Sequence, residues 1–419
     1  MSATTLGETE SESARASALL HALFSGSVTD PYPLYEELRE LGDGIHWSDD
    51  MHAYAVFRYE DVRKIGSDPG LFSSDVFWQS PQSFHDPDNS EHRRFIEYNS
   101  RLFMFSDPPV HTRIRSIFRH AFTPQAIQAW RPLVEEVTAE LLENYHVGDD
   151  IDIMPGFAAD VPVALIAAIL GVPKQKRSQF RAWSLAYALT FDPSVVGEAR
   201  DQAITTTLEL MDYLRELADE RRAEPTDDLI SLLVHTETTD GDHLQDVELL
   251  AQLTILLAAG NETTTSLIGN GLSILLDHPE ARAELTADPS KLPTAIEEML
   301  RYEAPLHFLF RKTTRETQLG DHVIPEGTVL LPSPGSANRD PRHFDNPDVF
   351  DISRPDNKHL TFFHGIHFCV GAPLARLEGA VVFEHLLKHY PDFSAGSEPA
   401  LRTSHSNSPR TWKTRPVRL

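Results

Sequence analysis

The feature that most constrains the fold of this chain is an apolar stretch from residue 249 to residue 276, in which Glu262 is the only charged residue. As a helix, this stretch would be about seven turns long. Polar residues interrupt it too often for a membrane span, so it predicts a helix buried in the middle of the fold. A lone carboxylate in such a helix is costly unless it has a partner or a function.

The residues around Glu262 weaken this predicted helix. Gly260 lowers helix stability, and the hydroxyl of Thr263 can bond to a backbone carbonyl in place of the helical ladder. Together they predict a local opening of the helix. Two interpretations of Thr263 follow: an ordinary hydroxyl that is satisfied within the helix, or a catalytic group placed at the opening.

A second feature is Cys369, the only cysteine in the sequence. It lies in a loop with Gly365 and Gly371, directly before Ala372–Glu378, which predicts the start of a helix. The positive end of a helix favours thiolate over thiol. A thiolate that has no disulfide partner suits a metal or a haem iron. The alternative is a buried free cysteine that packs as a small hydrophobic side chain.

Composition limits the class of protein. The chain has 37 lysines and arginines against 63 aspartates and glutamates, a net charge of −26, which argues against non-specific binding of nucleic acid. No apolar run of membrane-spanning length and no signal-peptide pattern occurs. Together with the single cysteine, this predicts a cytoplasmic protein that does not bind a membrane. Residues 1–25 are expected to be flexible, and residues 26–419 to form a single domain.

The segment Phe362-x-x-Gly365-x-His367-x-Cys369-x-Gly371 closely resembles the haem-binding loop of the cytochrome P450 family. The family usually has glycine directly after the first phenylalanine, and this chain has Phe363 there. The resemblance covers roughly residue 30 to the end. It implies the mainly α prism fold of that family with small β-sheets, in which haem b lies between a long distal helix and a proximal loop that carries Cys369.

The resemblance also assigns roles within this fold. Ala258-Ala-Gly-Asn-Glu-Thr-Thr264 resembles the family's oxygen-activation motif, which makes Glu262 a catalytic proton relay and Thr263 a catalytic hydrogen-bonding group. His111 and Arg115 are four residues apart and share a helix face, a pair suited to a carboxylate, and they resemble the pair that holds a haem propionate. The remaining expected haem contacts are Arg311 and His367 at the propionates, and Phe362, Gly365, Gly371, Ala259 and Gly260.

A scaffold motif supports the same assignment. Glu298 and Arg301 are three residues apart and resemble the family's Glu-x-x-Arg pair, and Arg354 would complete a buried triad. Such a triad contributes more to the register of the chain than to stability, because burying its charges costs desolvation. The alternative for any single pair of this spacing is an exposed ion pair.

Residues 71–106 form a long irregular stretch that is rich in aromatic residues, which argues against disorder. A short helix is expected at Asn89–Tyr98. In the family this loop roofs the substrate pocket; a surface flap attached to the core by its aromatic rings is the alternative. The residues expected to line the pocket are Phe77, Trp78, Phe103, Ala258, Phe308, Leu309 and Phe310, and residues 404–409 are expected to reach it.

The sequence is therefore interpreted as a haem-thiolate monooxygenase that inserts one atom of O2 into an apolar or ring-bearing organic molecule. No glycine-rich flavin or nicotinamide fingerprint occurs, so electrons are expected to come from outside the chain. The resemblance to bacterial members of the family implies a ferredoxin and a ferredoxin reductase as the donors. The chain is expected to be monomeric. The alternatives are a peroxide-driven haem enzyme of the same fold, which would not need Glu262 and Thr263, and a haem-binding sensor without catalysis.

Overall fold

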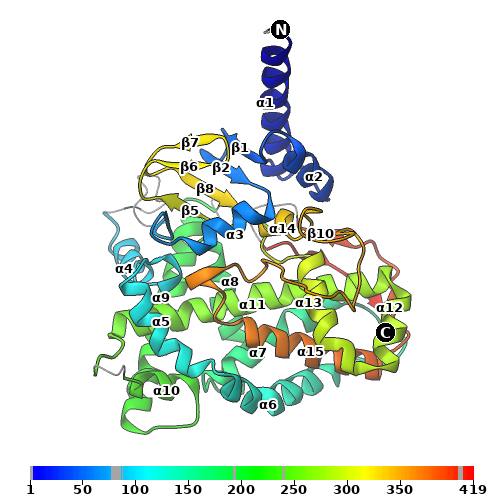
Figure 1. The fold of residues 1–419 in the computed structure, drawn as a ribbon. Helices are drawn as coiled ribbons and strands as arrows, with labels where there is room; N and C mark the ends of the chain where they lie inside the picture. Colours follow the sequence, from blue (N-terminus) through cyan, green and yellow to red (C-terminus); the bar gives the residue numbers. More distant parts are fainter. Residues whose placement is uncertain (1–2, 77–85, 87, 192–194, 238–240, 404–408) are drawn as a thin grey trace. The chain divides into compact units, whose positions relative to one another are not determined.

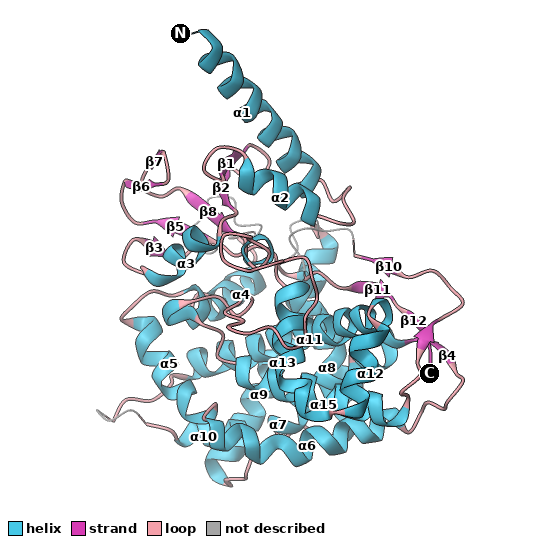
Figure 2. Cartoon of the chain, turned by 45° about the vertical axis from the view of Figure 1, so that its right-hand side comes forward, coloured by secondary structure: helices cyan, strands magenta, loops and turns pink. Residues whose placement is uncertain are grey.

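A computed structural model describes residues 3–76, 86, 88–191, 195–237, 241–403 and 409–419. In it the chain forms two compact units, each made of separate stretches of sequence. The first unit comprises Met1–Val76, Gly269–Cys369 and Glu398–Arg415, and the second comprises Phe77–Ile268, Val370–Ser397 and Pro416–Leu419. Helices predominate and the sheets are small (Figure 2), as the sequence predicts. The single domain expected for residues 26–419 stays a prediction.

The first unit is built around a sheet with the strand order β1-β2-β8-β5-β3 (Figure 1). Strands β2 and β8 pair in parallel, and the other neighbours in this sheet are antiparallel. Its strands are β1 (Ile45–Ser48), β2 (Ala53–Val56), β3 (Phe72–Ser73), β5 (Arg311–Thr313) and β8 (Val329–Pro332). Two separate two-stranded sheets also belong to this unit: β6 (Thr317–Leu319) with β7 (His322–Ile324), and β10 (Leu401–Arg402) with β11 (Trp412–Thr414). Its helices are α1 (Ala3–Phe24), α2 (Tyr32–Glu40), α3 (Tyr59–Ser67), α12 (Pro279–Ala287), η4 (Pro289–Lys291), α13 (Leu292–Tyr302), α14 (Pro334–Ala337) and η5 (Gly365–His367).

Within residues 1–25, which were expected to be flexible, the structure has the helix α1, and the flexibility itself stays a prediction. Its C-terminal half carries apolar residues at helical spacing, and Leu19, Leu20 and Leu23 are buried in a core cluster with Tyr35 and Phe57. This burial stabilises a helix that composition alone does not predict, because tertiary packing rather than propensity supplies most helical stability.

The second unit is mostly helical, and its core lies among α4 to α11 and α15. Its helices are α4 (Ser90–Asn99), η1 (Phe103–Phe105), α5 (Val110–Ala121), α6 (Pro124–Leu142), η2 (Met154–Ala158), α7 (Asp160–Ile169), η3 (Lys174–Lys176), α8 (Arg177–Leu189), α9 (Glu198–Ala223), α10 (Leu229–His235) and α15 (Ala372–His389). A small sheet has the order β4 (Asp150–Asp152), β12 (Pro416–Arg418), β9 (Ser394–Ala395).

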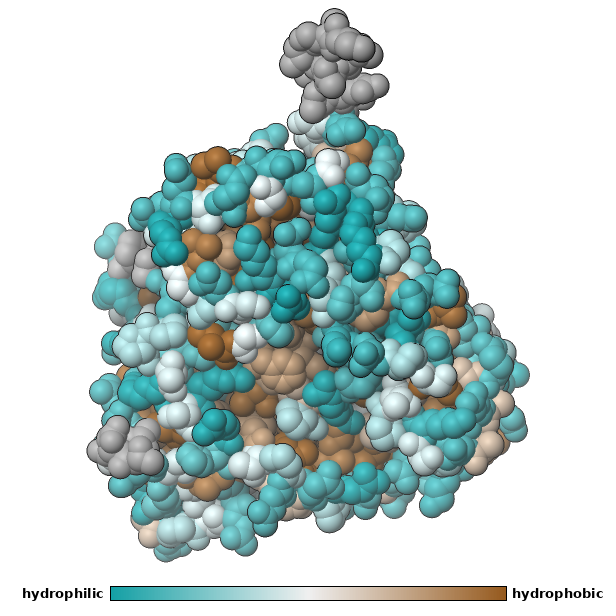
Figure 3. Space-filling view, in the orientation of Figure 1, coloured by the Kyte–Doolittle hydropathy of each residue, from teal (hydrophilic) through white to brown (hydrophobic). Residues whose placement is uncertain are grey.

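The long helix predicted at residues 249–276 is confirmed as α11 (Asp246–Asp277), which lies in the second unit as far as Ile268. The expected local opening is not observed, since α11 is continuous through Gly260 and Thr263. The Thr263 hydroxyl bonds to the Ala259 carbonyl without interrupting the helix. Within the described part of the chain, no helix is both long and apolar enough to span a membrane. Hydrophilic side chains predominate on the face shown in Figure 3.

Candidate active site

The loop around Cys369 belongs to the first unit and is held by short backbone contacts. The Cys369 amide donates to the Phe362 carbonyl at 2.9 Å, and the Cys369 side chain is exposed. Gly365 has φ +73°, and a Cβ at this position would lie 2.0 Å from the Gly66 carbonyl oxygen of α3. Gly365 is therefore required both by its backbone conformation and by the close approach of the loop to α3.

Two cationic candidates lie in the same unit as this loop. The ring nitrogen Nε2 of His367 lies 2.8 Å from the hydroxyl of Ser74, directly after β3. Arg311, the first residue of β5, is buried and donates to the Phe310 carbonyl at 2.6 Å. Its guanidinium carbon lies 4.7 Å from the centre of the Phe363 ring. Sequence reasoning missed Ser74, because nothing in its local pattern distinguishes it from other serines.

The two catalytic candidates occupy adjacent positions on α11 in the second unit. Burial raises the pKa of Glu262 to about 7, since desolvation disfavours the charged carboxylate. The Thr263 hydroxyl donates to the Ala259 carbonyl at 2.7 Å, which leaves its oxygen able to accept a further hydrogen bond. Gly260 has a packing role, because a Cβ there would lie 3.1 Å from the Ile166 side chain of α7. Haem contacts of Ala259 and Gly260 remain a prediction.

The predicted propionate pair lies on α5, also in the second unit. His111 is buried and Arg115 is half-buried. The Phe103 ring contacts both, with its centroid 6.0 Å from that of His111 and 5.9 Å from the Arg115 guanidinium carbon. The Phe103 amide donates to the side chain of Gln252 of α11 at 3.2 Å. Phe103, expected to line the pocket, therefore packs against the pair.

The three residues of the predicted triad lie together in the first unit. Arg301 binds Glu298 through two hydrogen bonds of 2.7 Å, and both side chains are fully buried. Arg354 contacts the same carboxylate at 3.1 Å, and Asn357 donates to it at 3.0 Å. The surplus arginine donors bind backbone carbonyls between residues 338 and 349. This arrangement ties α13 to the segment that leads into the cysteine loop.

The short helix expected in the 71–106 stretch is confirmed as α4, one residue from the predicted bounds, with Asn89 as its N-cap. One face of α4 forms polar contacts with α8 and α9. The contacts are Glu91 with Thr205 at 2.6 Å, His92 with Asp201 at 3.1 Å, Arg94 with Asp212, Tyr98 with Arg215, and Asn99 with Tyr187 at 2.5 Å. Between them Phe95 packs against Tyr187. Sequence reasoning missed these contacts because the partners are about 90 to 120 residues away.

The remaining pocket candidates have different surroundings. Phe308 lies in a core cluster of the first unit, where its ring contacts Phe24, Tyr35 and Phe57, so its ring is used in packing. Phe310 packs against the same cluster and Leu309 against a neighbouring one, and Ala258 is buried in the core of the second unit. Phe77, Trp78 and residues 404–408 lie outside the described residues.

A buried carboxyl group that sequence reasoning missed is Glu378 of α15. It is 2 % exposed, and burial raises its pKa well above the usual value. Burial therefore favours the neutral form of this carboxyl over the carboxylate. In the sequence, Glu378 cannot be told from an exposed glutamate on a helix. Its burial depends on how α15 packs in the fold.

A mainly helical protein with a cysteine in a glycine-rich loop, and with arginine and histidine side chains in the same unit, has the donors that a haem-thiolate protein uses. The cytochrome P450 family profile matches residues 163–394. The 6-deoxyerythronolide B hydroxylase of Saccharopolyspora erythraea is 41 % identical over 88 % of this chain and 90 % of its own length. The cytochrome P450 monooxygenase PikC of Streptomyces venezuelae is 37 % identical over 91 % of this chain and 88 % of its own length.

Solved structures agree with this result. The bacillaene polyketide synthase cytochrome P450 PksS of Bacillus subtilis 168 superposes with a TM-score of 0.83 and 34 % identity, covering 93 % of this chain and 97 % of that one. The chain belongs to the cytochrome P450 family and is a haem-thiolate monooxygenase. The donor set fits that cofactor, because a cysteine thiol can ligate its iron and arginine and histidine side chains can bind its carboxylates.

Proposed function

We propose that this chain oxidises an apolar, ring-bearing molecule of secondary metabolism, with Cys369 as the axial ligand of the haem iron. The single observation that carries the ligand assignment is the chemistry of the loop: the only cysteine in the sequence is exposed, and its amide closes the loop onto Phe362. Haem bound through a thiolate supplies the chemistry that activates dioxygen. His111 with Arg115, and Arg311 with His367, are proposed to bind the haem propionates.

Glu262 and Thr263 are proposed to deliver protons during catalysis. A carboxyl whose pKa is about 7 can both accept and release a proton near neutral pH. The Thr263 hydroxyl, fixed by its bond to Ala259, can accept a hydrogen bond from a water and is held in one rotamer. With haem bound, a proton supplied from these two side chains would serve the activation of dioxygen and limit the release of peroxide.

The absorption spectrum of the reduced, carbon monoxide-bound protein tests the ligand. A red-shifted Soret band, typical of thiolate ligation, is expected for the wild type, and the Cys369→His variant is expected to show the shorter-wavelength band of histidine ligation. A wild-type protein with the shorter-wavelength band would contradict the assignment of Cys369.

The Thr263→Ala variant tests proton delivery. We expect it to bind haem as the wild type does but to divert at least about tenfold more reducing equivalents into hydrogen peroxide, because a positioned proton-transfer group typically contributes about 10²- to 10⁴-fold. The measurement compares peroxide formed with NADPH consumed. Thr265→Ala, on the same helix, is the matched control. Normal coupling in Thr263→Ala would contradict its assigned role.

The substrate class and electron donors are proposed from the relatives. Two of them are by name a 6-deoxyerythronolide B hydroxylase and a polyketide synthase cytochrome P450, so we propose a polyketide-like or similarly ring-bearing substrate. A spectral titration with macrolactones and steroids, read as a shift of the haem to high spin, tests this class. A ferredoxin with its reductase is the proposed donor, and loss of turnover when the ferredoxin is omitted is the expected result. We propose a monomer in the cytoplasm.

A further inference from the structure

The structure gives a reason for the residue at which this chain departs from its family. Phe363 follows the first phenylalanine of the haem loop, where the family usually has glycine, and its backbone has φ +60°. A bulky side chain in this left-handed region is a genuine conformational outlier. Such strain persists only where the surroundings hold it. The ring must therefore form contacts that a glycine cannot.

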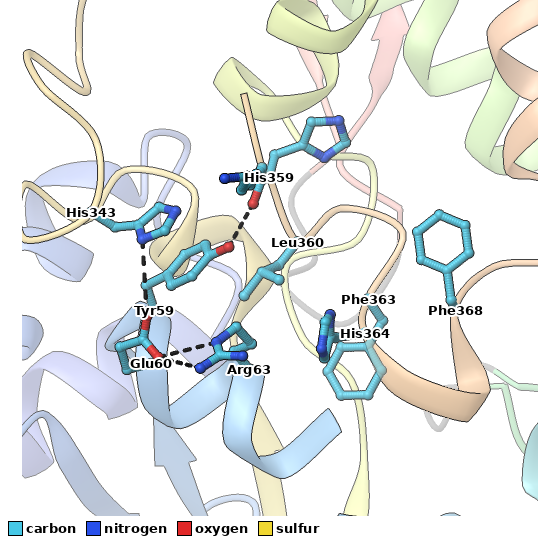
Figure 4. A pocket seen from close by; sticks show the side chains of 10 residues that line it. Tyr59, Glu60, Arg63, His343, His359, Leu360, Phe363, His364 and Phe368 are labelled. Carbon is cyan, nitrogen blue, oxygen red and sulfur yellow. Dashed lines mark hydrogen bonds and ion pairs between the residues drawn. The ribbon is translucent and has the colours of Figure 1, made fainter. Parts of the chain in front are cut away.

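The ring of Phe363 lies between α3 and β5 of the first unit. It is 5 % exposed and belongs to a core cluster with Tyr59 and Val62 of α3. Gly66 leaves room for it, since a Cβ on Gly66 would lie 3.2 Å from the tip of the ring. The ring also forms part of the wall of a surface pocket of about 410 Å³, beside His364 (Figure 4). It is thus fixed by packing rather than free to turn.

Arg311 of β5 lies over this fixed ring, with its guanidinium carbon 4.7 Å from the ring centre. Arg311 is 8 % exposed, so the attraction between the cation and the ring is only weakly screened by water. A guanidinium held over an aromatic face keeps its N–H donors in one plane, pointing sideways, which is the geometry that binds a carboxylate through two hydrogen bonds. A glycine at position 363 would leave the Arg311 side chain without an aromatic ring to pack against.

We propose that Phe363 is a positioning residue: its ring holds the Arg311 guanidinium in the orientation that binds a haem propionate. This inference rests on the proposed role of Arg311 as a propionate ligand. The strained backbone of Phe363 is maintained by burial of the ring and by its contact with Arg311, and in return the ring reduces the freedom of the arginine before haem binds.

A double-mutant cycle on the holoenzyme tests the inference. The variants are Phe363→Leu, which keeps apolar bulk but removes the aromatic face, Arg311→Gln, and the two combined. The measurements are the rate of haem transfer to excess apomyoglobin and the midpoint potential of the haem. Phe363→Leu is expected to speed haem loss about thirtyfold in the wild-type background, the size of a desolvated cation–π pair, and to have almost no effect once Arg311 is replaced.

Equal acceleration by Phe363→Leu in both backgrounds would overturn the inference, because the ring would then contribute only packing. If Arg311→Gln itself leaves haem loss and the midpoint potential unchanged, the propionate assignment of Arg311 fails, which is a separate result. The carbon monoxide spectrum and far-UV circular dichroism check that each variant folds. If Phe363→Leu does not fold, Phe363→Met takes its place in the cycle, because the flexible methionine can fill the same space.

Discussion

The substitution Glu262→Gln should stabilise the protein, and by more at high pH than at low pH. Burial raises the pKa of this carboxyl from its usual 4.5 to about 7 in the folded state. Ionising the Glu262 carboxyl therefore costs more free energy in the folded protein than in the unfolded chain. Below pH 4.5 the group is neutral in both states and costs nothing; the cost grows as the pH rises through 4.5 to 7 and is constant above pH 7.

The size of the effect follows from the pKa. A shift of this size corresponds to about 3 kcal/mol above pH 7, at about 1.4 kcal/mol per pKa unit, and to about 1 kcal/mol at pH 5. Glutamine has nearly the same shape and carries no charge at any pH, so the variant avoids this cost. For 419 residues, an unfolding entropy of about 2 cal/mol/K per residue converts these energies into a rise in Tm of about 3 °C at pH 8 and about 1 °C at pH 5.

The assay is thermal unfolding of the wild type and the variant across pH 5 to 8, followed by circular dichroism. Glu97→Gln, an exposed glutamate on α4, is the matched control and should change Tm little at either pH. A difference in Tm between Glu262→Gln and the wild type that is the same at pH 5 and at pH 8 would refute the reasoning, because it would mean that the buried carboxyl ionises as it does in the unfolded chain.

Three further substitutions test the packing around the site. Gly365→Ala places a Cβ 2.0 Å from a backbone carbonyl at a positive φ, and haem content per mole of protein should fall several-fold, whereas Gly327→Ala, with a positive φ but open space around it, should retain haem. Glu298→Gln leaves buried arginine charge without its carboxylate and should lower stability by about 3–5 kcal/mol, measured by chemical denaturation; no loss would mean that backbone carbonyls suffice. Tyr187→Phe removes one buried hydrogen bond to α4, which should cost about 1 kcal/mol and speed amide exchange in α4; unchanged exchange would show that the other contacts hold α4.

Local patterns were enough to predict the elements that carry their own signal. The apolar stretch with one carboxylate predicts α11 within a few residues of its observed bounds. The glycines and the helix start around Cys369 predict a loop that can present a thiolate, and the spacing of Glu298 and Arg301 predicts an ion pair on one helix face. These predictions hold because the interacting groups lie within a few residues of one another or repeat at the period of the helix.

Contacts between distant residues could not be predicted in this way. His367 bonds to Ser74, α4 is held by α8 and α9, and a Cβ on Gly260 would lie close to the Ile166 side chain. No local pattern encodes these pairings, since each depends on how separate elements pack. The expected opening of α11 is also not observed. The Thr263 hydroxyl adds a bond to the Ala259 carbonyl, and the helix stays continuous.

The sequence by itself predicted the family, the cofactor class and the candidate reactive groups, because residue types at short, fixed spacings carry these signals. Only the tertiary structure decided which charges are buried and what each ring contacts. Phe363 shows the difference: in the sequence it is a departure from the usual glycine, and in the fold it is a strained residue whose ring supports Arg311. Burial and distant contacts arise when elements pack, so they set the pKa of Glu262 and the orientation of Arg311 after the motifs are already in place.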